Sequence, residues 1–344
     1  MLSQTKLIDG IEKLLATKRR IDTAFSVVLL TGENAYKLKR EVRNGFLDYS
    51  SLWKRKALCE REFMLNKKTS PDLYKRVVVV CQNESGSLKL WNGEDSQPGV
   101  PMEYLIEMNR FDEKQLLSGL ASHGLLKEEL CRSVAAKVTE MHAAAPIVEA
   151  ENYPEKFLKV ANITCQQFRD STRGIVPDEA LETIPQGVRA AFDGCRQILA
   201  ARCKGGFIRE CHGDLHLGNI CIFNGTPCIF DAVEFNTEFT HIDTLYDLAF
   251  LIMDLHHHGL PGLATQVAEA YCTGTNTETS DYETVMPLYL GLRAIIRCSI
   301  SSASSRESTS NNSATWLRSE ATKYLKEAFS FLDVLPKNHT ARND

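Results

Sequence analysis

The chain has 344 residues, of which 43% are hydrophobic and 24% are charged, and its formal net charge is −4. This length predicts two domains or one two-lobed domain, and no run of about 18 uncharged apolar residues supports a membrane-spanning helix. Eleven scattered cysteines without a CxxC pair exclude a typical secreted disulfide scaffold, so we expect reduced thiols in a cytoplasmic protein.

The first part of the chain predicts a small, mostly antiparallel sheet with one important helix. Residues 1–20 mix acidic and apolar side chains, which predicts an amphipathic helix and not a signal peptide. Two apolar runs flank residues 31–34 (TGEN), which is typical of a β-hairpin, and period-two alternation then places Ala35, Lys37 and Lys39 on one face. Further elements are predicted as a helix over residues 50–68 and strands over 76–82, 87–93 and 102–108.

From Phe111 the pattern becomes helical. A helical pair broken near His123 and Gly124 is predicted, followed by a helix that ends at Gly205 and by a loop with short strands. Four more helices are predicted over residues 241–259, 263–274, 286–300 and 316–332, with a mobile Ser-rich loop over 299–315. The elements together predict an α+β fold with a small antiparallel β lobe over residues 1–108 and a larger, mainly helical lobe over 109–344.

The charge of the chain is unevenly spread. Residues 1–80 hold 17 Lys and Arg against nine Asp and Glu, whereas the remainder is acidic. A basic first part suits an anionic ligand such as a nucleotide, and an acidic second part suits a divalent cation. Ordinary solvated surface explains both features equally well, so charge alone decides nothing.

The sequence HGDLHLGN at residues 212–219, followed by IFD at 229–231, holds the groups that phosphoryl transfer needs. In that reaction a carboxylate orients and deprotonates the attacking hydroxyl, and oxygen ligands hold Mg²⁺ on the phosphates. Asp214 is the candidate base, and Asn219 and Asp231 are the candidate metal ligands. A carboxylate at the end of an apolar strand is costly unless a cation compensates it, which favours a metal ion at Asp231.

These motifs resemble the catalytic loop and metal-binding aspartate of the aminoglycoside-phosphotransferase-like family, which has the protein-kinase-like fold. The sequence AYKLK at residues 35–39 is similar to the lysine strand of that fold. The resemblance implies that Ala35 covers the adenine of the nucleotide and that Lys37 binds its phosphates.

The same resemblance assigns roles to three further segments. CEREFMLN at residues 59–66 is similar to the helix whose glutamate pairs with the lysine, which implies Glu62, with Glu60 as the alternative. EYLIEM is similar to the hinge, which implies that the backbone from Ile106 to Met108 receives the adenine. In the catalytic loop, His216 takes a position from which it would contact the γ-phosphate.

More narrowly, TGENAYKLK, CEREFMLNKK and DLAFLIMDL are similar to a poorly characterised bacterial subgroup of the family. Some of its members carry an additional P-loop kinase domain, but no GxxxxGKS/T motif is present in this sequence. HIDTLYDLAF at residues 241–250 resembles the helix start that supports the catalytic loop, which implies a structural role for Asp243 or Asp247.

The chain also departs from protein kinases. No GxGxxG motif precedes the lysine strand, and residues 231–233 are DAV in place of DFG. Only eleven residues separate Asp231 from Asp243, which leaves no room for an activation segment that docks a protein substrate. We therefore expect a phosphotransferase that uses ATP or GTP with Mg²⁺ and acts on a hydroxyl group of a small molecule, without a membrane or nucleic-acid partner.

Three other interpretations stay open. The missing glycine motif supports a non-catalytic nucleotide-binding regulatory protein of the same fold. Transfer of a nucleotidyl group in place of a phosphoryl group fits the same residues. A zinc site built from His212, Asp214 and His216 is ranked lower, because it leaves Lys37 and Asp231 unexplained.

Several other side chains allow two interpretations each. Lys39 shares a face with Lys37 and reaches either phosphate or solvent, and Glu234 is a candidate metal or substrate group. Arg293 and Arg297 lie four residues apart on an apolar helix and suit either an anionic substrate or salt bridges. The histidines at 256–258 end a helix and are expected at the surface.

Overall fold

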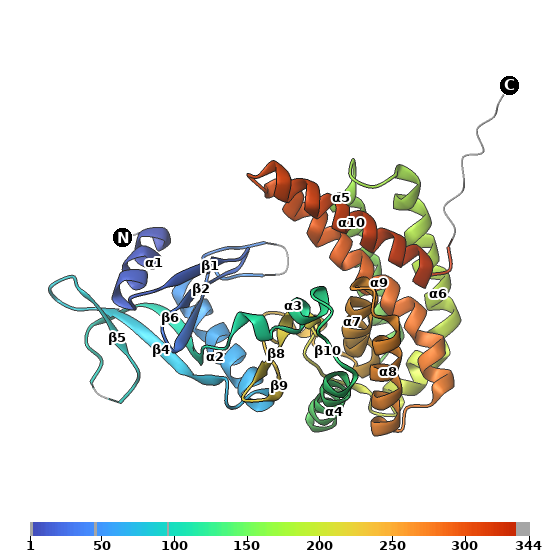
Figure 1. Ribbon diagram of the computed structural model, residues 1–344, viewed down its shortest axis with the longest axis horizontal. Coiled ribbons are helices and arrows are strands. Elements are labelled where there is room, and N and C mark those ends of the chain that lie inside the picture. Colours follow the sequence, from blue (N-terminus) through green and yellow to red (C-terminus); the bar gives the residue numbers. More distant parts are fainter. Residues whose placement is uncertain (1–2, 45–46, 95, 335–344) are drawn as a thin grey trace. The chain divides into compact units, whose positions relative to one another are not determined.

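The computed structural model describes residues 3–44, 47–94 and 96–334, which form two compact units (Figure 1). Unit 1 comprises the described residues up to Leu120 together with His212–Thr240. Unit 2 comprises Ala121–Cys211 together with the described residues from His241 onwards. Unit 1 contains an antiparallel sheet and unit 2 is mainly helical, so the predicted α+β class is confirmed.

The grouping of the chain differs from the predicted lobe boundary at residue 108. Residues 212–240 were expected to belong to the helical lobe, but they pack with the sheet of unit 1. They contain a two-stranded hairpin, β8 (Ile220–Phe223) and β9 (Thr226–Ile229), in which Cys221 and Cys228 are opposite each other. Both cysteines join an apolar cluster with sheet residues, which explains why this segment belongs to unit 1.

The centre of unit 1 is a six-stranded antiparallel sheet with the order β1-β2-β3-β6-β4-β5. Its strands are β1 (Arg19–Asp22), β2 (Ser26–Leu30), β3 (Asn34–Lys39), β4 (Tyr74–Gln82), β5 (Leu88–Trp91) and β6 (Val100–Asn109). The predicted hairpin joins β2 to β3, where the Thr31 N–H donates to the Asn34 carbonyl at 2.8 Å. The long connection from β3 to β6 brings Lys37 opposite Ile106.

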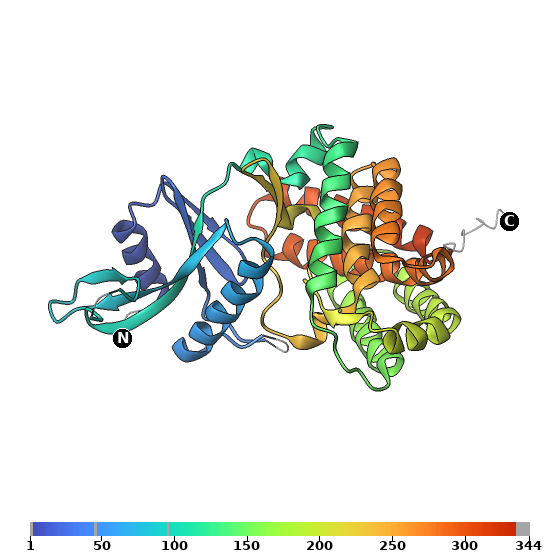
Figure 2. The same ribbon diagram turned by 90° about the horizontal axis from the view of Figure 1, so that it is seen from below.

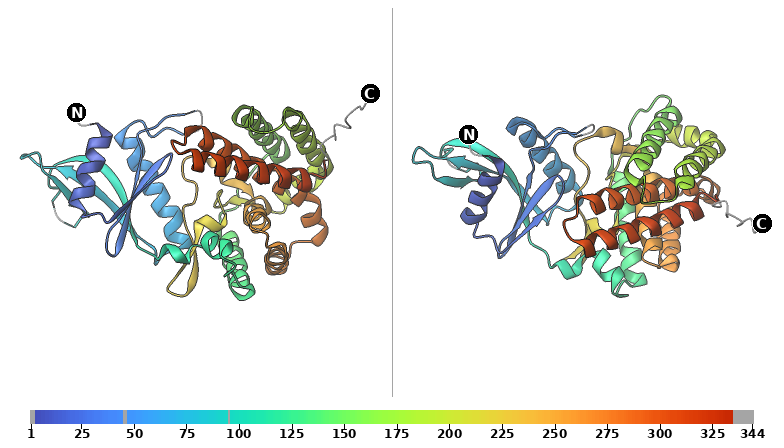
Figure 3. Two further views of the ribbon diagram at one scale, coloured as in Figure 1. Left: turned by 45° about the horizontal axis from the view of Figure 1, so that its top comes forward. Right: turned by 90° about the horizontal axis from the view of Figure 1, so that it is seen from above.

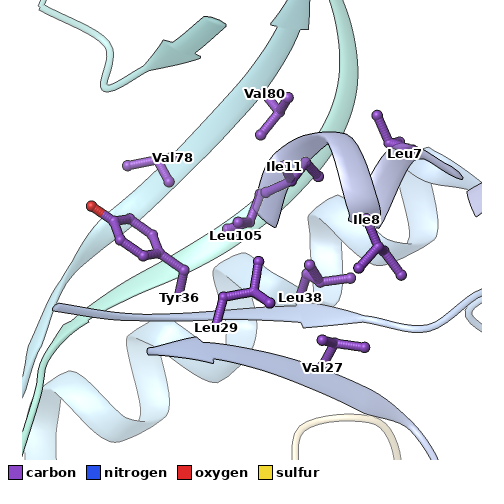
Figure 4. Close-up of a cluster of buried hydrophobic side chains, with 10 residues drawn as sticks. All are labelled: Leu7, Ile8, Ile11, Val27, Leu29, Tyr36, Leu38, Val78, Val80 and Leu105. Carbon is purple, nitrogen blue, oxygen red and sulfur yellow. The ribbon is translucent and has the colours of Figure 1, made fainter. Parts of the chain in front are cut away.

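Alternation along β3 directs its side chains to two faces that are covered by different helices. Tyr36 and Leu38 lie on the face covered by α1 (Gln4–Leu14), whose Leu7 and Ile11 pack among them (Figure 4). This confirms the amphipathic helix predicted near the start of the chain. The apolar stripe of α1 is buried against the sheet, and its polar stripe faces solvent.

The other face of the sheet carries Ala35, Lys37 and Lys39, and α2 (Leu52–Thr69) packs on it (Figure 2). The buried stripe of α2 has helical spacing and consists of Arg55, Cys59, Glu62 and Asn66. Helix α2 therefore presents polar groups, and not only apolar ones, to the strand that carries the lysines.

Unit 2 is built mainly from seven described helices. They are α4 (Glu128–Ala144), α5 (Tyr153–Thr172), α6 (Asp178–Lys204), α7 (Thr244–His257), α8 (Pro261–Thr275), α9 (Thr279–Glu307) and α10 (Asn311–Phe331). Helix α4 packs on α8, and α9 and α10 lie side by side (Figure 3). Two short strands, β7 (Ile208–Glu210) and β10 (His241–Asp243), pair ahead of α7. The 3-10 helices Glu113–Gln115, Leu217–Asn219 and Thr237–Phe239 belong to unit 1, and α3 (Leu117–Ser122) includes the sequence boundary between the units.

The predicted mobile loop over residues 299–315 is wrong. Helix α9 continues to Glu307 and α10 begins at Asn311, so most of the Ser-rich segment is helical. Ser302 and Ser305 are buried, and the Ser305 hydroxyl donates to the Ser302 carbonyl at 2.8 Å. Small side chains that bond to their own helix permit close packing, which here outweighs their weak helix propensity.

Helix α5, in contrast, was not predicted.

None of the helices within the described ranges has both the length and the apolar character that crossing a membrane requires.

Candidate active site

The structure brings together the lysine of β3, a glutamate of α2 and the aspartate that follows β9. Lys37 Nζ lies 2.9 Å from Glu62 Oε1 and also bonds to the Asp231 carboxylate. The Lys37 side chain is 12% exposed and Glu62 is fully buried. Burial disfavours the charged amine, but the carboxylates of Asp231 and Glu62 outweigh this effect, so the pKa of Lys37 lies well above its usual range.

The choice between the two glutamates of α2 is settled by this geometry. Glu62 lies on the buried stripe of the helix, whereas Glu60 is exposed and pairs with Lys56 at 3.8 Å. Glu62 also uses its second oxygen, because Lys39 Nζ lies 2.6 Å from Oε2. One buried carboxylate therefore joins both lysines of the strand.

The catalytic loop forms a second group of contacts. The amide nitrogen of Asn219 donates to both the carboxylate and the backbone carbonyl of Asp214, each at 2.9 Å. The Gly218 N–H donates to His216 Nδ1 at 3.0 Å, so the proton of the neutral ring is on Nε2. That nitrogen lies 3.4 Å from the Asp214 carboxylate. Asn219 and His216 therefore both face the candidate base.

His212 connects residues 212–219 to Phe230, which precedes the candidate metal ligand Asp231. Its Nδ1 accepts a hydrogen bond from the Asp214 N–H, and its Nε2 lies 2.9 Å from the Phe230 carbonyl. The Phe230 N–H donates to the Asn219 carbonyl at 3.0 Å, so the two candidate ligand positions are adjacent along paired chain segments. Because both ring nitrogens of His212 are engaged within the chain, His212 has no nitrogen left for a zinc ion shared with Asp214 and His216.

Asp231 has an unusual backbone that its neighbours support. Its φ is 65°, in the left-handed region, which costs a residue other than glycine about 1–2 kcal/mol. The Asp231 N–H donates to the Tyr74 hydroxyl at 3.2 Å, and the next N–H, that of Ala232, donates to Asn66 Oδ1 at 3.0 Å. Just upstream, the Ser70 hydroxyl donates to the Ile229 carbonyl at 2.9 Å. Strain held in this way is common at functional residues.

The sequence missed these supporting residues. Tyr74, Asn66 and Ser70 lie in ordinary helix and strand patterns, and no local signal marks them. Only the helical spacing of Asn66 from Glu62, four residues, places the two on one face of α2.

The residues predicted as the hinge lie within β6. Met108 is paired with Ala35 on β3 and with Tyr74 on β4, and Ile106 is likewise paired on both sides. Because β6 has a neighbouring strand on each side, the backbone groups of these residues point towards β3 or β4. The sheet ends at Asn109, and the chain first leaves it after that residue.

An apolar cluster surrounds the predicted adenine-covering residue. Ala35 and Met108 belong to it together with Cys221, and the rings of Phe111 and Phe230 pack against it with their centroids 5.4 Å apart. The two aromatic rings are only partly buried. The cluster thus presents flat apolar groups next to the end of β6.

Three further sequence expectations concern unit 2. The expectation of a surface position is wrong for His257, which is buried, stacks on Tyr324 at 3.7 Å and bonds to Glu320 at 2.7 Å. Arg293 is also buried, and its Nε donates to the Tyr246 carbonyl at 3.2 Å. Its side chain is therefore held by contacts within unit 2. Arg297 Nε donates to the Tyr324 hydroxyl at 3.4 Å.

Solved structures of other proteins share this fold. One is APH(2")-IIia in complex with GDP and kanamycin, with a TM-score of 0.55, 10% identity and coverage of 94% of this chain and 98% of that one. Another is choline kinase from Cryptosporidium parvum, with a TM-score of 0.54, 11% identity and 96% coverage of both chains. A third is amicoumacin kinase in complex with AMP-PNP, Ca²⁺ and Ami, with a TM-score of 0.53, 12% identity and 94% coverage of both chains. The two-lobed kinase-like fold predicted from the sequence is thereby confirmed.

Residues 71–288 match the sequence model of the phosphotransferase enzyme family, and the chain belongs to this family. Its curated relatives include uncharacterised proteins of Mycobacterium tuberculosis and Mycobacterium bovis, which are 24% identical over 282 residues. The match covers 81% of this chain and 53% of each relative, so the chain spans about half the length of these relatives. The resemblance that the motifs indicated is confirmed at the level of the family.

Proposed function

We propose that the protein uses ATP or GTP with Mg²⁺ and transfers the γ-phosphate to a hydroxyl group of a small molecule. The observation that carries this proposal is the position of Lys37, which is bonded both to Glu62 and to Asp231, 194 residues further along the chain. A buried cation between two carboxylates can take up a nucleotide phosphate in exchange for one of them.

Mg²⁺ prefers oxygen ligands, and the donors present fit that preference. Asp231 offers a carboxylate whose side chain is 41% exposed. The amide of Asn219 uses its nitrogen in the bonds to Asp214, which leaves its oxygen as the ligand atom. When bound, the ion would neutralise charge on the phosphates. Lys37 would then bind the α- and β-phosphates while Glu62 holds its amine in place.

Asp214 is the proposed base of the reaction. Its carboxylate is held by the Asn219 amide, and in this orientation it would accept the proton of the attacking hydroxyl. His216 lies beside it, and the contact of His216 with the γ-phosphate stays a prediction. In this proposal proton transfer depends on Asp214 alone.

The apolar cluster around Ala35 and Met108 is the proposed site for the base of the nucleotide. Ile106 and Met108 are paired within the sheet, and the N–H groups of Asn109 and Arg110 donate to the carbonyls of Leu73 and Glu33. We therefore assign the polar contacts of the base to the backbone of Phe111 and Asp112. Flat contact with Phe111 and Phe230 would complete this site.

Two observations support a small-molecule acceptor. The eleven residues between Asp231 and Asp243 are too few to form a docking platform for a protein substrate. Solved proteins of the same fold include a complex with kanamycin and kinases of amicoumacin and choline.

The proposal is tested by replacing Asp214 with Ala and measuring Mg²⁺-dependent consumption of ATP and GTP with a panel of hydroxyl-bearing metabolites. Turnover should fall by about 100- to 10,000-fold, because a positioned base contributes roughly that factor. Nucleotide affinity should stay within about threefold of wild type. Asp170→Asn, a change at an exposed site on α5, is the control and should retain full turnover.

Each alternative predicts a different result. Unchanged turnover in Asp214→Ala would refute the assignment of the base. A wild-type protein that binds nucleotide but consumes none with any acceptor would favour the non-catalytic interpretation. Mass analysis of the product separates phosphoryl from nucleotidyl transfer.

A further inference from the structure

We propose that Lys39 is a positioning residue that holds the metal-ligand segment, defined as residues 229–234, against the sheet and α2. This inference rests on the proposed function, because it concerns the placement of Asp231. Lys39 Nζ lies 2.6 Å from Glu62 Oε2 and also bonds to the carboxylate of Glu234, 195 residues away in the sequence. The interaction therefore joins β3, α2 and the end of the segment.

The burial of Lys39 separates its role from that of Lys37. Lys39 is only 1% exposed, and its amine lies 5.0 Å from the centre of the Tyr49 ring. The Tyr49 hydroxyl bonds to the same oxygen of Glu234 that Lys39 contacts. Burial disfavours the charged amine, but Glu234 and Glu62 outweigh it and hold the pKa of Lys39 well above its usual range. The amine is thus charged and enclosed, so Lys39 does not act as a phosphate ligand.

The Lys39 contact also revises the expected role of Glu234. That carboxylate was a candidate for metal or substrate binding, but it is 5% exposed and directed at Lys39 and Tyr49. Glu234 follows Asp231 by three residues. An anchor at Glu234 therefore restrains the same short segment whose backbone is strained at Asp231.

Charge balance shows why the anchor matters. Three carboxylates, Glu62, Asp231 and Glu234, share the two ammonium groups of Lys37 and Lys39. The cluster has one excess negative charge, which suits a site that gains a cation at its most exposed member, Asp231. Without the Lys39 ammonium, Glu62 and Glu234 would repel each other in a buried space. Glu234 would then turn towards solvent and displace the segment that carries Asp231.

The test measures Mg²⁺ binding and does not need the acceptor. Non-hydrolysable analogues of ATP and GTP are used as probes, and Mg²⁺ is titrated into the protein–nucleotide mixture by calorimetry. Lys39→Met is expected to weaken Mg²⁺ binding by about 10- to 100-fold, the usual effect of losing a residue that orients a metal ligand. Nucleotide affinity without Mg²⁺ should change by less than about threefold. Lys56→Met, which removes an exposed lysine of α2, should leave both unchanged.

A second variant distinguishes charge from packing. Lys39→Met/Glu234→Gln removes the unpaired carboxylate together with the amine but keeps an oxygen at position 234 that can accept the bond of the Tyr49 hydroxyl. The segment then stays attached without charge repulsion, so this variant should recover most of the lost Mg²⁺ affinity. A cavity or packing defect at Lys39 would not be repaired by a change at Glu234. If Lys39→Met does not fold, the double variant carries the test, because it is expected to fold and to bind Mg²⁺ within about tenfold of wild type.

The outcomes separate this inference from the proposed function. A wild-type protein that binds neither nucleotide with Mg²⁺ refutes the proposed function. A wild type that binds, with a Lys39→Met variant that behaves like Lys56→Met, refutes only the positioning role. The role is also overturned if Lys39→Met loses nucleotide affinity in the absence of Mg²⁺, or if the double variant recovers nothing.

Discussion

Replacing Arg202 with Met is expected to destabilise the protein strongly through one buried ion pair in unit 2. The Arg202 guanidinium makes two parallel bonds of 2.7 Å to the carboxylate of Asp243. The side chains of Arg202 and Asp243 are 1% and 0% exposed. The same carboxylate accepts bonds from the Leu245 N–H at 2.8 Å and the Tyr289 hydroxyl at 3.2 Å, so it also caps α7.

The magnitude follows from what the substitution leaves behind. Met fills much of the space of Arg202, but within the described residues the Asp243 carboxylate keeps the two neutral donors Leu245 N–H and Tyr289 hydroxyl and loses its ion-pair partner. Removing one partner of a buried pair costs about 3–5 kcal/mol, because the other charge stays desolvated. We therefore expect Arg202→Met to lower the free energy of unfolding by that amount.

Helix α6 offers a matched control. Arg189 lies on the same helix and pairs with Asp193, four residues later, at 3.0 Å, but both side chains are about half exposed. An exposed pair of this kind contributes about 0.3–0.5 kcal/mol. Arg189→Met therefore makes the same chemical change at an expected cost roughly tenfold smaller.

The assay is urea unfolding at pH 7, followed by circular dichroism and by tryptophan fluorescence. Coincident transitions would justify extracting a free energy from a chain with two units. Adding Asp243→Asn to Arg202→Met should restore part of the loss, since the amide keeps the cap without the charge. If Arg202→Met and Arg189→Met differ by less than about 1 kcal/mol, the reasoning from burial is refuted.

Two further predictions concern the catalytic loop and the buried thiols. Gly213→Ala should lower the melting temperature more than Gly225→Ala. Both glycines have positive φ, but only at Gly213 would a Cβ meet a backbone oxygen, that of Phe239, at 2.7 Å; equal melting temperatures would contradict this. Burial raises the pKa of Cys195 and Cys221 from 9.0 to about 12. The contribution of these thiols to the free energy of unfolding is therefore fully present below pH 9. Above pH 9 it falls by about 1.4 kcal/mol per pH unit for each thiol, because the thiols ionise in the unfolded chain. Urea midpoints that stay constant from pH 8 to pH 10.5 would contradict this account.

Much of the candidate site was predictable because its signals are local. Asp214 and Asn219 lie five residues apart just ahead of an apolar run, Asp231 directly follows another, and Lys37 lies on a strand with clear alternation. Glu62 was preferred to Glu60, and the buried stripe of α2 shows that helical spacing contained the answer. The roles of these residues remain proposals, but their positions follow from sequence periodicity.

Other features were not predictable from local patterns. The pairing of residues 106–108 within β6 was not foreseen, because a strand that continues with apolar residues does not mark where its partners end. The Ser-rich segment was assigned to a loop, because weak helix propensity is visible in the sequence whereas packing between α9 and α10 is not.

The sequence by itself determined the α+β class, the family and the five central residues of the candidate site, which are Lys37, Glu62, Asp214, Asn219 and Asp231. Only the tertiary structure decided that Lys39 is enclosed between Glu62 and Glu234, and that residues 212–240 pack with the sheet. The physical reason is that alternation and spacing act over a few neighbouring residues. The burial and pairing of a charge depend instead on partners that are distant in the sequence and meet only in the folded chain.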